Sequence, residues 1–219
     1  MFDFDNKTLR SDTYGLAVDA RHFPGPLFTR LKRGTDILVS LLLLGPVVLI
    51  GVCLLALNPF LNKGPLFFRQ ARMGRNCKPF GVIKFRTMTV TTKRTRCADD
   101  PLEVSRITKL GRVLRKSRLD ELPQILNVLR GDMSLIGPRP DDFAHARAYL
   151  RSVPGYRQRH SVRPGISGLA QVELGYIEGR DATYHKVQRD LFYIENRSLK
   201  LEFWIFWKTL TTVAGGKGT

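Results

Sequence analysis

The residues best suited to chemistry are two adjacent carboxylates, Asp120 and Glu121, in the stretch Asp-Glu-Leu-Pro-Gln. Because proline is tolerated only in the first turn of a helix, Pro123 predicts that a helix begins close to Asp120. Arg130-Gly131 predicts its end, since glycine often follows a helix C-terminus. The helix dipole and the free N–H groups at such an N-terminus favour carboxylates, and they equally suit a phosphate or a metal-bound diphosphate.

These residues allow two interpretations of the role of Asp120. It could be a carboxylate nucleophile towards phosphorus, which must be ionised, or it could be only the N-cap of the helix. By the opposite-charge rule, the basic residues just before it should keep it ionised. These residues are Arg112, Arg115, Lys116 and Arg118.

Two downstream loops hold arginines in stiff frames. Gly137-Pro138-Arg139-Pro140 places one guanidinium between two prolines, and Arg163-Pro164-Gly165 places another beside permissive backbone. An arginine fixed in this way can bind a phosphate through two hydrogen bonds. Either loop could be only a turn, but both together, after a carboxylate pair, predict a phosphate site.

The charge balance also predicts anionic partners. The chain has 219 residues and a net charge of +17, and its hydrophobic content of 43% excludes wholesale disorder and a transporter with many spans. Between Asp36 and Asp99 there are ten basic residues and no acidic one. Nucleic acid, lipid headgroups and phosphorylated substrates all fit this charge.

One hydrophobic run could enter a membrane. Residues 37–57 carry no charge, and 15 of these 21 residues are Ile, Leu or Val. This composition favours insertion by roughly 5 to 9 kcal/mol. The run starts too late and is too long for a signal peptide, and a core helix of this length would carry a polar stripe.

The flanks of this run indicate how it enters the bilayer. Gly45-Pro46 lies at its middle and predicts a bend. Basic residues precede the run at Lys32-Arg33 and follow it from Lys63, so the positive-inside tendency draws both ends to the cytoplasm. We therefore favour a re-entrant helix, with a break at Gly45-Pro46, over a kinked transmembrane span.

Shorter elements surround these features. Residues 1–29 predict a poorly ordered leader, residues 65–69 and 80–85 a small β-hairpin, and residues 87–100 a loop. Apolar residues at helical spacing predict a basic amphipathic helix over residues 106–116, which could lie on anionic lipid.

Aromatic residues gather near the C-terminus, after a helix predicted over residues 184–193. They fit the headgroup level of a bilayer or, equally, an ordinary core. The cluster comprises Phe203, Trp204, Phe206 and Trp207.

Cysteines and histidines add no site. The three cysteines have no C-x-x-C spacing, and no two histidines stand three or four residues apart. Neither a disulfide framework nor a zinc or histidine metal site is therefore indicated.

Taken together, these motifs resemble the monotopic phosphoglycosyl transferases, also called bacterial sugar transferases, which start the assembly of cell-surface glycans. The resemblance covers residues 31–212 and includes Lys32-Arg33 and Asp36 at the entry to the hydrophobic run. It rests further on GPLFFRQARMGRNCKPFGVIKFRTM, RITKLGRVLRKSRLDELPQILNVLRGDMSLIGPRP, VRPGISGLAQV and RDLFYIENRSLKLEFWIFWKTL. Several long motifs in one order are far more specific than a single short one.

The resemblance implies a mainly α-helical α+β enzyme at the cytoplasmic face of the bacterial inner membrane. Such an enzyme transfers a sugar 1-phosphate from a UDP-sugar to a polyprenyl phosphate such as undecaprenyl phosphate, and releases UMP. Asp120 would be the nucleophile, forming an aspartyl phosphosugar in a ping-pong scheme. Glu121 would position Mg²⁺ or assist proton transfer, and both carboxylates are candidate Mg²⁺ ligands.

The resemblance also implies cationic ligands for substrate phosphates. The candidates are Arg139, Arg163, Arg118 and Arg86. The family's break is often Ser-Pro, whereas Gly45-Pro46 keeps the proline and lacks the hydroxyl. Leu169 replaces a frequent tryptophan, so nothing about the sugar carries over.

The expected organisation is a catalytic core alone, without the further membrane domain of longer members. It comprises a leader at residues 1–29, a re-entrant membrane helix at 30–58, a catalytic domain at 59–214 and a tail at 215–219. The expected partners are a nucleotide sugar, a polyprenyl phosphate and inner-membrane lipid. No nucleic-acid partner is expected, and a homodimer is one possible oligomeric state.

A function of another class remains as the rival. A membrane-tethered protein could use the same basic charge to bind nucleic acid or anionic lipid without catalysis. Such a protein should tolerate Asp120→Asn, whereas an enzyme should lose turnover.

Overall fold

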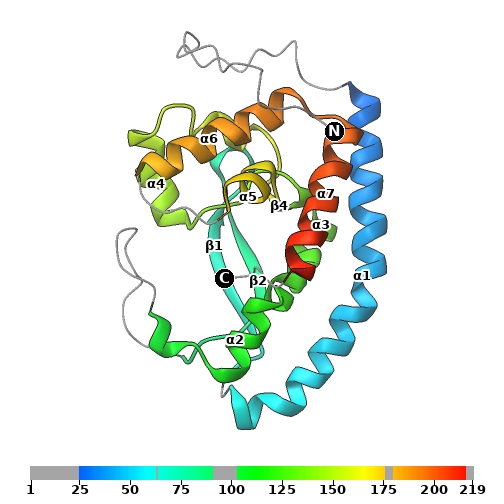
Figure 1. Ribbon diagram of the computed structural model, residues 1–219, viewed down its shortest axis with the longest axis vertical. Coiled ribbons are helices and arrows are strands. Elements are labelled where there is room, and N and C mark those ends of the chain that lie inside the picture. The colour runs from blue at the N-terminus through cyan, green and yellow to red at the C-terminus, as the bar shows by residue number, and fades with distance from the viewer. Residues whose placement is uncertain (1–24, 63, 91–102, 176–179, 216–219) are drawn as a thin grey trace.

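The computed structural model describes residues 25–62, 64–90, 103–175 and 180–215. These residues are mainly helical and contain two small two-stranded sheets, which confirms a helical α+β class. In Figure 1 a long helix runs down one side of the molecule, and a β-hairpin lies near the centre. Most of the predicted leader, most of the predicted loop at 87–100 and nearly all of the predicted tail lie outside the described residues.

The first helix, α1 (Pro26–Leu61), is 36 residues long and begins with a proline, which suits a first turn. It continues through Gly45-Pro46 and Pro59, so the segment is one helix and not two helices separated by a break. Its axis turns in the lower half of Figure 1. Proline removes one helical hydrogen bond and bends the axis. The helix remains continuous because apolar residues before and after Pro46 pack on the same domain.

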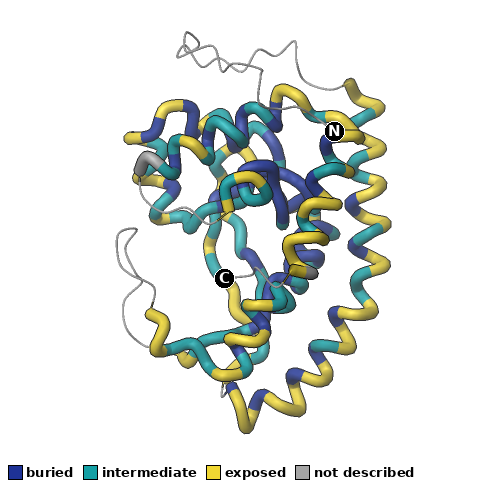
Figure 2. The backbone as a smooth tube through the Cα atoms, viewed as in Figure 1, coloured by how far each residue is buried: buried dark blue, intermediate teal, exposed yellow. Residues whose placement is uncertain are grey.

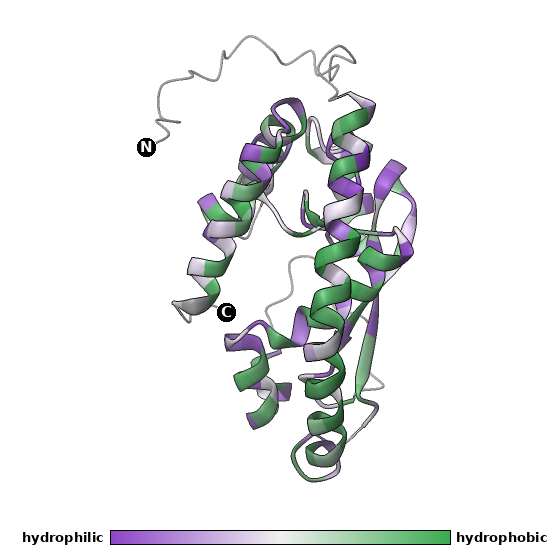
Figure 3. Ribbon diagram, turned by 90° about the vertical axis from the view of Figure 1, so that its right-hand side faces the viewer, coloured by the Kyte–Doolittle hydropathy of each residue, from purple (hydrophilic) through white to green (hydrophobic). Residues whose placement is uncertain are grey.

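The two faces of α1 differ in what they contact. Val47 and Leu54 are buried against Phe85, Leu114 and Ile125 of the domain. The opposite face is apolar and exposed along its length (Figures 2 and 3), and it includes Leu38, Leu41, Leu42, Val48, Leu49, Val52, Leu55 and Phe60. Within the described residues, α1 is the one helix long and apolar enough to cross a membrane, which supports membrane association.

Polar contacts attach the start of α1 to the domain. Asp36 accepts hydrogen bonds from the hydroxyl of Ser134 at 2.8 Å and from the N–H of Leu135 at 3.2 Å. Arg33 donates to two carbonyl groups at the end of helix α3 (Ile125–Arg130). The bonds from Arg33 satisfy carbonyls that the C-terminus of α3 leaves unpaired. Together with the contacts of Asp36, they fix the start of α1 against both α3 and the segment at residues 134–135.

The predicted hairpin is present. Strands β1 (Phe67–Met73) and β2 (Pro79–Phe85) are antiparallel, with Phe67 opposite Phe85 and Met73 opposite Pro79. They are joined through the short 3₁₀ turn η2 (Arg75–Cys77). One edge of β2 pairs with β1, and the strand also packs against the turn that carries the carboxylate pair.

A second, parallel sheet has no clear pattern in the sequence. Strands β3 (Ser134–Ile136) and β4 (Gly165–Ser167) pair in parallel. The backbones of the two arginine loops meet where the N–H of Gly165 donates to the carbonyl of Pro138 at 3.0 Å. A Cβ added at Gly165 would lie 2.2 Å from the backbone nitrogen of Gly137, so this close approach requires glycine. Strands of three residues are too short for a recognisable alternation of apolar and polar positions.

Helices complete the domain around a core that includes Met73, Tyr156, Val187 and Leu191. They confirm the helices predicted near residues 106–116 and 184–193. The elements are η3 (Val104–Arg106), α2 (Lys109–Lys116), η4 (Leu119–Gln124), α4 (Phe143–Ser152), η5 (Gln158–Ser161), α5 (Leu169–Leu174), α6 (Arg180–Glu195) and α7 (Leu199–Ala214).

The aromatic cluster lies on α7 and faces mainly outward. Leu201 and Ile205 point into the core, whereas the side chains of Phe203 and Trp207 are 67% and 57% exposed. The aromatic residues at these two positions therefore do not form the core. Their contact with lipid headgroups stays a prediction.

Candidate active site

The carboxylate pair lies in the 3₁₀ helix η4, which leads directly into α3. A helix does begin near Asp120, but its first turn is 3₁₀ and the α-helix starts only at Ile125. Pro123 has no N–H, so this part of the chain cannot complete the α-helical ladder. The residue before η4 is Arg118, in the left-handed region with φ of 58°, and Gly131 ends α3 as expected. Asp120 is therefore inside a helical turn and is not an N-cap.

Glu121 is held by two cations. Its Oε1 lies 2.7 Å from Nζ of Lys84 on β2. Arg139 approaches with both terminal nitrogens, donating from Nη1 to Oε2 at 3.0 Å and from Nη2 to Oε1. Burial alone would raise the pKa of Glu121, but Arg139 and Lys84 outweigh it and hold that pKa well below its usual range. Glu121 is therefore a fixed anion with both oxygens engaged.

Asp120 is equally buried, and no described residue donates a hydrogen bond to it. Burial and the neighbouring charge of Glu121 raise its pKa to about 6, although Lys84, Arg115 and Arg139 pull it down. The expectation that nearby cations keep Asp120 ionised thus holds only in part, because burial is the larger effect. Because this pKa lies below 7, Asp120 is mainly ionised at neutral pH. The result is a carboxylate that is charged, poorly solvated and unpaired.

The loop that carries Arg139 is supported from behind. Nη1 of Arg139 also donates to the carbonyl of Ile166 at 3.2 Å, and its own carbonyl accepts from Nη2 of Arg159 at 2.8 Å. Arg159 is buried between Asp141 and Asp190. Burial would lower the pKa of Arg159, but these two carboxylates outweigh it and raise the pKa, so the cation is permanent. The loop is thereby tied to the core.

The structure does not bring all the predicted arginines to the carboxylates. Arg163 donates to the carbonyl of Gly131 at 2.9 Å, at the opposite end of α3 from the pair. Arg86 donates to the carbonyl of Pro65 at 2.9 Å and lies over the ring of Phe68, at the junction of α1 and β1. Both side chains satisfy backbone carbonyls or pack locally here, so the phosphate roles expected of them have no geometric support. Arg139 and, by its position in the turn, Arg118 remain candidates.

Two basic residues at the site have weak sequence signals. Lys84 is the only charged residue in the apolar strand β2, which is the feature that could have revealed it. Arg72 on β1 donates from Nη1 to the carbonyl of Pro140 at 3.0 Å and so braces the Arg139 loop. Burial, and then the charge of Arg139, lower the pKa of Arg72.

The described residues contain no group of three or more His, Cys, Asp or Glu side chains that could hold a metal. The oxygens of Glu121 are already bound to Lys84 and Arg139, which removes the geometric support for Glu121 as an Mg²⁺ ligand. Asp120 has free oxygens. One carboxylate together with substrate phosphates is a usual environment for protein-bound Mg²⁺, so the residues fit a metal that arrives with its substrate.

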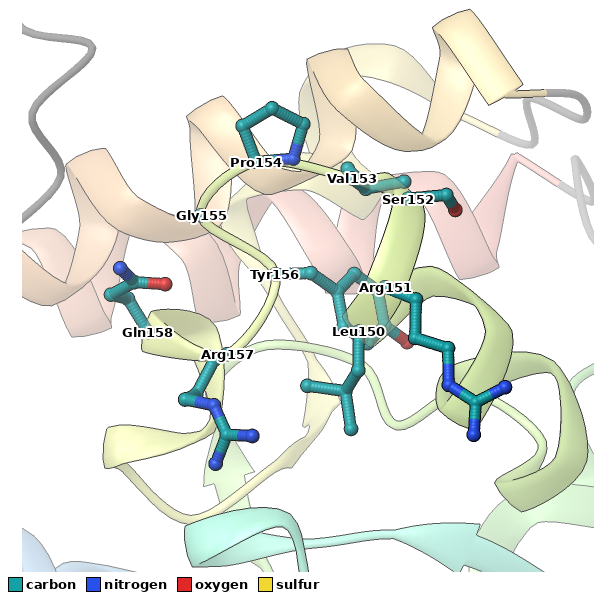
Figure 4. A pocket seen from close by; sticks show the side chains of 9 residues that line it. All are labelled: Leu150, Arg151, Ser152, Val153, Pro154, Gly155, Tyr156, Arg157 and Gln158. Carbon is teal, nitrogen blue, oxygen red and sulfur yellow. The ribbon is translucent and has the colours of Figure 1, made fainter.

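One hollow lies away from the carboxylate pair. It has a volume of about 310 Å³ and is lined by one continuous stretch, residues 150–158, between α4 and η5 (Figure 4). Neither Asp120 nor Glu121 lines it. A hollow built from one turn brings together no groups from other elements, so we do not assign the site to it.

Comparisons with known proteins show the family of the chain. The family model for bacterial sugar transferases matches residues 27–216, so the chain belongs to this family. An Aeromonas hydrophila protein named UDP-N-acetylgalactosamine-undecaprenyl-phosphate N-acetylgalactosaminephosphotransferase is 41% identical over 89% of this chain and 46% of its own length. A Klebsiella pneumoniae protein named UDP-glucose:undecaprenyl-phosphate glucose-1-phosphate transferase is 39% identical over 82% of this chain and 39% of its own length.

A third relative has a similar size. The Rhizobium leguminosarum bv. phaseoli exopolysaccharide production protein PSS is 38% identical over 86% of this chain and 98% of its own length. The chain thus spans less than half the length of the first two relatives and nearly all of the third.

Asp120→Asn should stabilise the protein at high pH only. Burial raises the folded-state pKa of Asp120 to about 6. A carboxyl whose pKa is raised by folding favours the folded state at low pH and loses that contribution as pH rises. The amide resembles the neutral acid, so at pH 8 the variant should gain about 2 to 3 kcal/mol in free energy of unfolding.

Thermal unfolding in detergent at pH 4 and pH 8 measures this effect. The difference between the two proteins should fall below about 1 kcal/mol at pH 4. Glu195→Gln, at an exposed position on α6, serves as the control. An Asp120→Asn variant that is no more stable at pH 8 than the parent would contradict the burial of an unpaired charge.

Proposed function

We propose that the protein transfers a sugar 1-phosphate from a UDP-sugar to undecaprenyl phosphate, giving undecaprenyl diphosphate-sugar and UMP, as the first membrane step of surface glycan assembly. The observation that carries this proposal is the difference between two adjacent carboxylates. Glu121 is neutralised by Lys84 and Arg139, whereas Asp120 is ionised and accepts no hydrogen bond from a described residue. Such an arrangement fits a nucleophile next to a fixed cationic frame. The names of the relatives support the substrates.

In this proposal a carboxylate oxygen of Asp120 attacks the sugar-bearing phosphorus of the donor. The new O–P bond forms as the bond to the bridging oxygen breaks, and UMP leaves with that oxygen and its electron pair. The phosphate of the lipid then attacks the same phosphorus, and Asp120 is released. Lys84 and Arg139 stabilise the charge that develops on the phosphoryl oxygens.

Glu121 has a role in this scheme that differs from both roles expected of it. With its pKa held well below the usual range it is a weak base, so it is poorly suited to take a proton from the lipid phosphate. We assign it the task of holding Lys84 and Arg139 beside Asp120. Mg²⁺, bound by Asp120 and the diphosphate, would supply further neutralisation of donor charge.

The attachment of α1 supports a re-entrant helix at the cytoplasmic face of the bacterial inner membrane. Near its start Asp36 binds β3, and just past its end the side chain of Asn62 donates to the carbonyl of Arg86 at 2.7 Å. Both ends of α1 are thus bound to one domain. A domain that lies on one side of the membrane would keep both ends on that side, while the exposed apolar face and the aromatic residues of α7 contact lipid.

Isotope exchange should reveal the first half of the reaction. Labelled UMP should exchange into a UDP-sugar in the presence of Mg²⁺ and without polyprenyl phosphate, because formation of the aspartyl phosphosugar is reversible. UDP-glucose and UDP-N-acetylgalactosamine are the first donors to test. Asp120→Asn should lower the exchange rate by about three orders of magnitude or more.

The control is again Glu195→Gln, which should exchange at the parental rate. A protein that turns over with lipid acceptor but shows no exchange without it would contradict the covalent scheme. If the parent protein and the Asp120→Asn variant bind anionic vesicles equally well, and the parent has neither turnover nor exchange with any UDP-sugar, the binding-only rival would be supported.

The sidedness of α1 can be measured with single cysteines in a cysteine-free background. Thr29→Cys and Leu61→Cys replace exposed residues near the two ends of the helix. Both should react with a membrane-impermeant maleimide in inside-out vesicles, and neither should react in intact spheroplasts. Labelling of the two ends from opposite sides would exclude the re-entrant arrangement.

A further inference from the structure

Among the described residues, no strand covers one edge of β2. Its other edge pairs with β1, and the sheet is two-stranded within the described residues. On the uncovered edge the N–H of Ile83 and the carbonyl of Gly81 are the groups that a third strand would use. Asn127 of α3 binds both: its Oδ1 accepts from Ile83 at 3.0 Å, and its Nδ2 donates to Gly81 at 2.8 Å.

The carboxamide of Asn127 is well suited to fix this contact. The side chain is fully buried. Its carbonyl oxygen faces the N–H of Ile83 and its NH₂ group faces the carbonyl of Gly81, so only one orientation of the carboxamide satisfies both bonds. The backbone is held as well, because the carbonyl of Asn127 accepts from the N–H groups of Asp132 and Met133 at 3.0 and 3.2 Å. Asn127 is thus fixed at both ends between α3 and β2.

The position of this contact links it to the candidate active site. Lys84 directly follows Ile83 on β2, and Glu121 lies on η4, which runs straight into the helix that carries Asn127. We infer that Asn127 is a positioning residue: its carboxamide fixes the strand that carries Lys84 against the turn that carries Glu121. The ion pair between Lys84 and Glu121 depends on this alignment.

Two physical considerations favour this role over simple coverage of an edge. A water could satisfy the same backbone groups without fixing β2 along its own axis, whereas one carboxamide that bridges residues 81 and 83 from a packed helix sets the position of the strand. The contact at Ile83 also lies one residue from Lys84, so a shift of β2 at Ile83 would move Lys84 by about the same distance. Displacements of about 1 Å at a reacting centre can lower a rate by about a hundredfold.

The first test needs no activity and so is independent of the proposed function. Lys84 in the parent protein is enclosed by its ion pair and should react slowly with acetic acid N-hydroxysuccinimide ester. Asn127→Ala should raise the acetylation rate of Lys84, read by peptide mass spectrometry, roughly tenfold, since the strand is released locally. The matched control is Val128→Ala, because Val128 is buried on the same helix and makes no polar side-chain contact with β2.

The second test is a double-mutant cycle on turnover, and it rests on the proposed function. Asn127→Ala should lower kcat by about tenfold with little change in KM. In a Lys84→Met background the same substitution should lower kcat by less than about twofold, because both substitutions act through the ion pair between Lys84 and Glu121. Val128→Ala and Lys84→Met should combine multiplicatively. If Asn127→Ala fails to fold, Asn127→Ser, which keeps a hydrogen-bonding group, carries both tests.

The outcomes separate the two claims. An unchanged Lys84 acetylation rate in Asn127→Ala, or the same rise in Val128→Ala, would overturn the positioning role. A full tenfold loss of kcat in the Lys84→Met background would overturn it too. Absence of turnover in the parent protein with every UDP-sugar, together with Lys84 release in Asn127→Ala alone, would refute the proposed function and leave the positioning role intact.

Discussion

The ion pairs of Glu121 with Lys84 and Arg139 are the interaction on which the site depends. They join three segments that are distant in sequence, namely β2, η4 and the loop after β3. Bringing such charges out of water is costly unless their geometry is good and their remaining groups are satisfied. Here the geometry is fixed on two sides, by Arg159 behind the Arg139 loop and by Asn127 on β2. The fold thus supplies a rigid cationic frame before any substrate is present.

This frame explains why two neighbouring carboxylates have different properties. Glu121 takes both cations and becomes a weak base, while Asp120, one residue earlier, has its pKa raised by burial and by Glu121. Neighbouring carboxylates whose environments push their pKa values apart divide chemical roles in this way. The positive φ of Arg118, just before the pair, is a second unfavourable feature at the same turn. Such local costs are commonly found where function requires them.

The sequence predicts elements whose pattern is local. The hairpin, the helix α2, the end of α3 at Gly131 and the carboxylate pair all follow from residue type and spacing, and each is present. The features that the sequence does not predict depend on contacts between distant segments.

The β3–β4 sheet is set by a close approach at Gly137, and Lys84 is recognisable as a site residue only once β2 lies against η4. Arg163 has the same local frame as Arg139, but parallel pairing of β3 and β4 leaves it at the far end of α3. Gly45-Pro46 does not divide α1, because the domain packs against the helix on both sides of the proline.

The side chain that carries the donor's phosphosugar can be identified chemically. Protein shown to turn over is incubated with UDP-sugar and Mg²⁺ without acceptor, then treated with hydroxylamine, which converts an acyl phosphate into a hydroxamate, and digested for tandem mass spectrometry. If Asp120 is the nucleophile, we expect a hydroxamate at Asp120 and an unmodified Glu121. A hydroxamate at Glu121, or no modified peptide from the active protein, would contradict it.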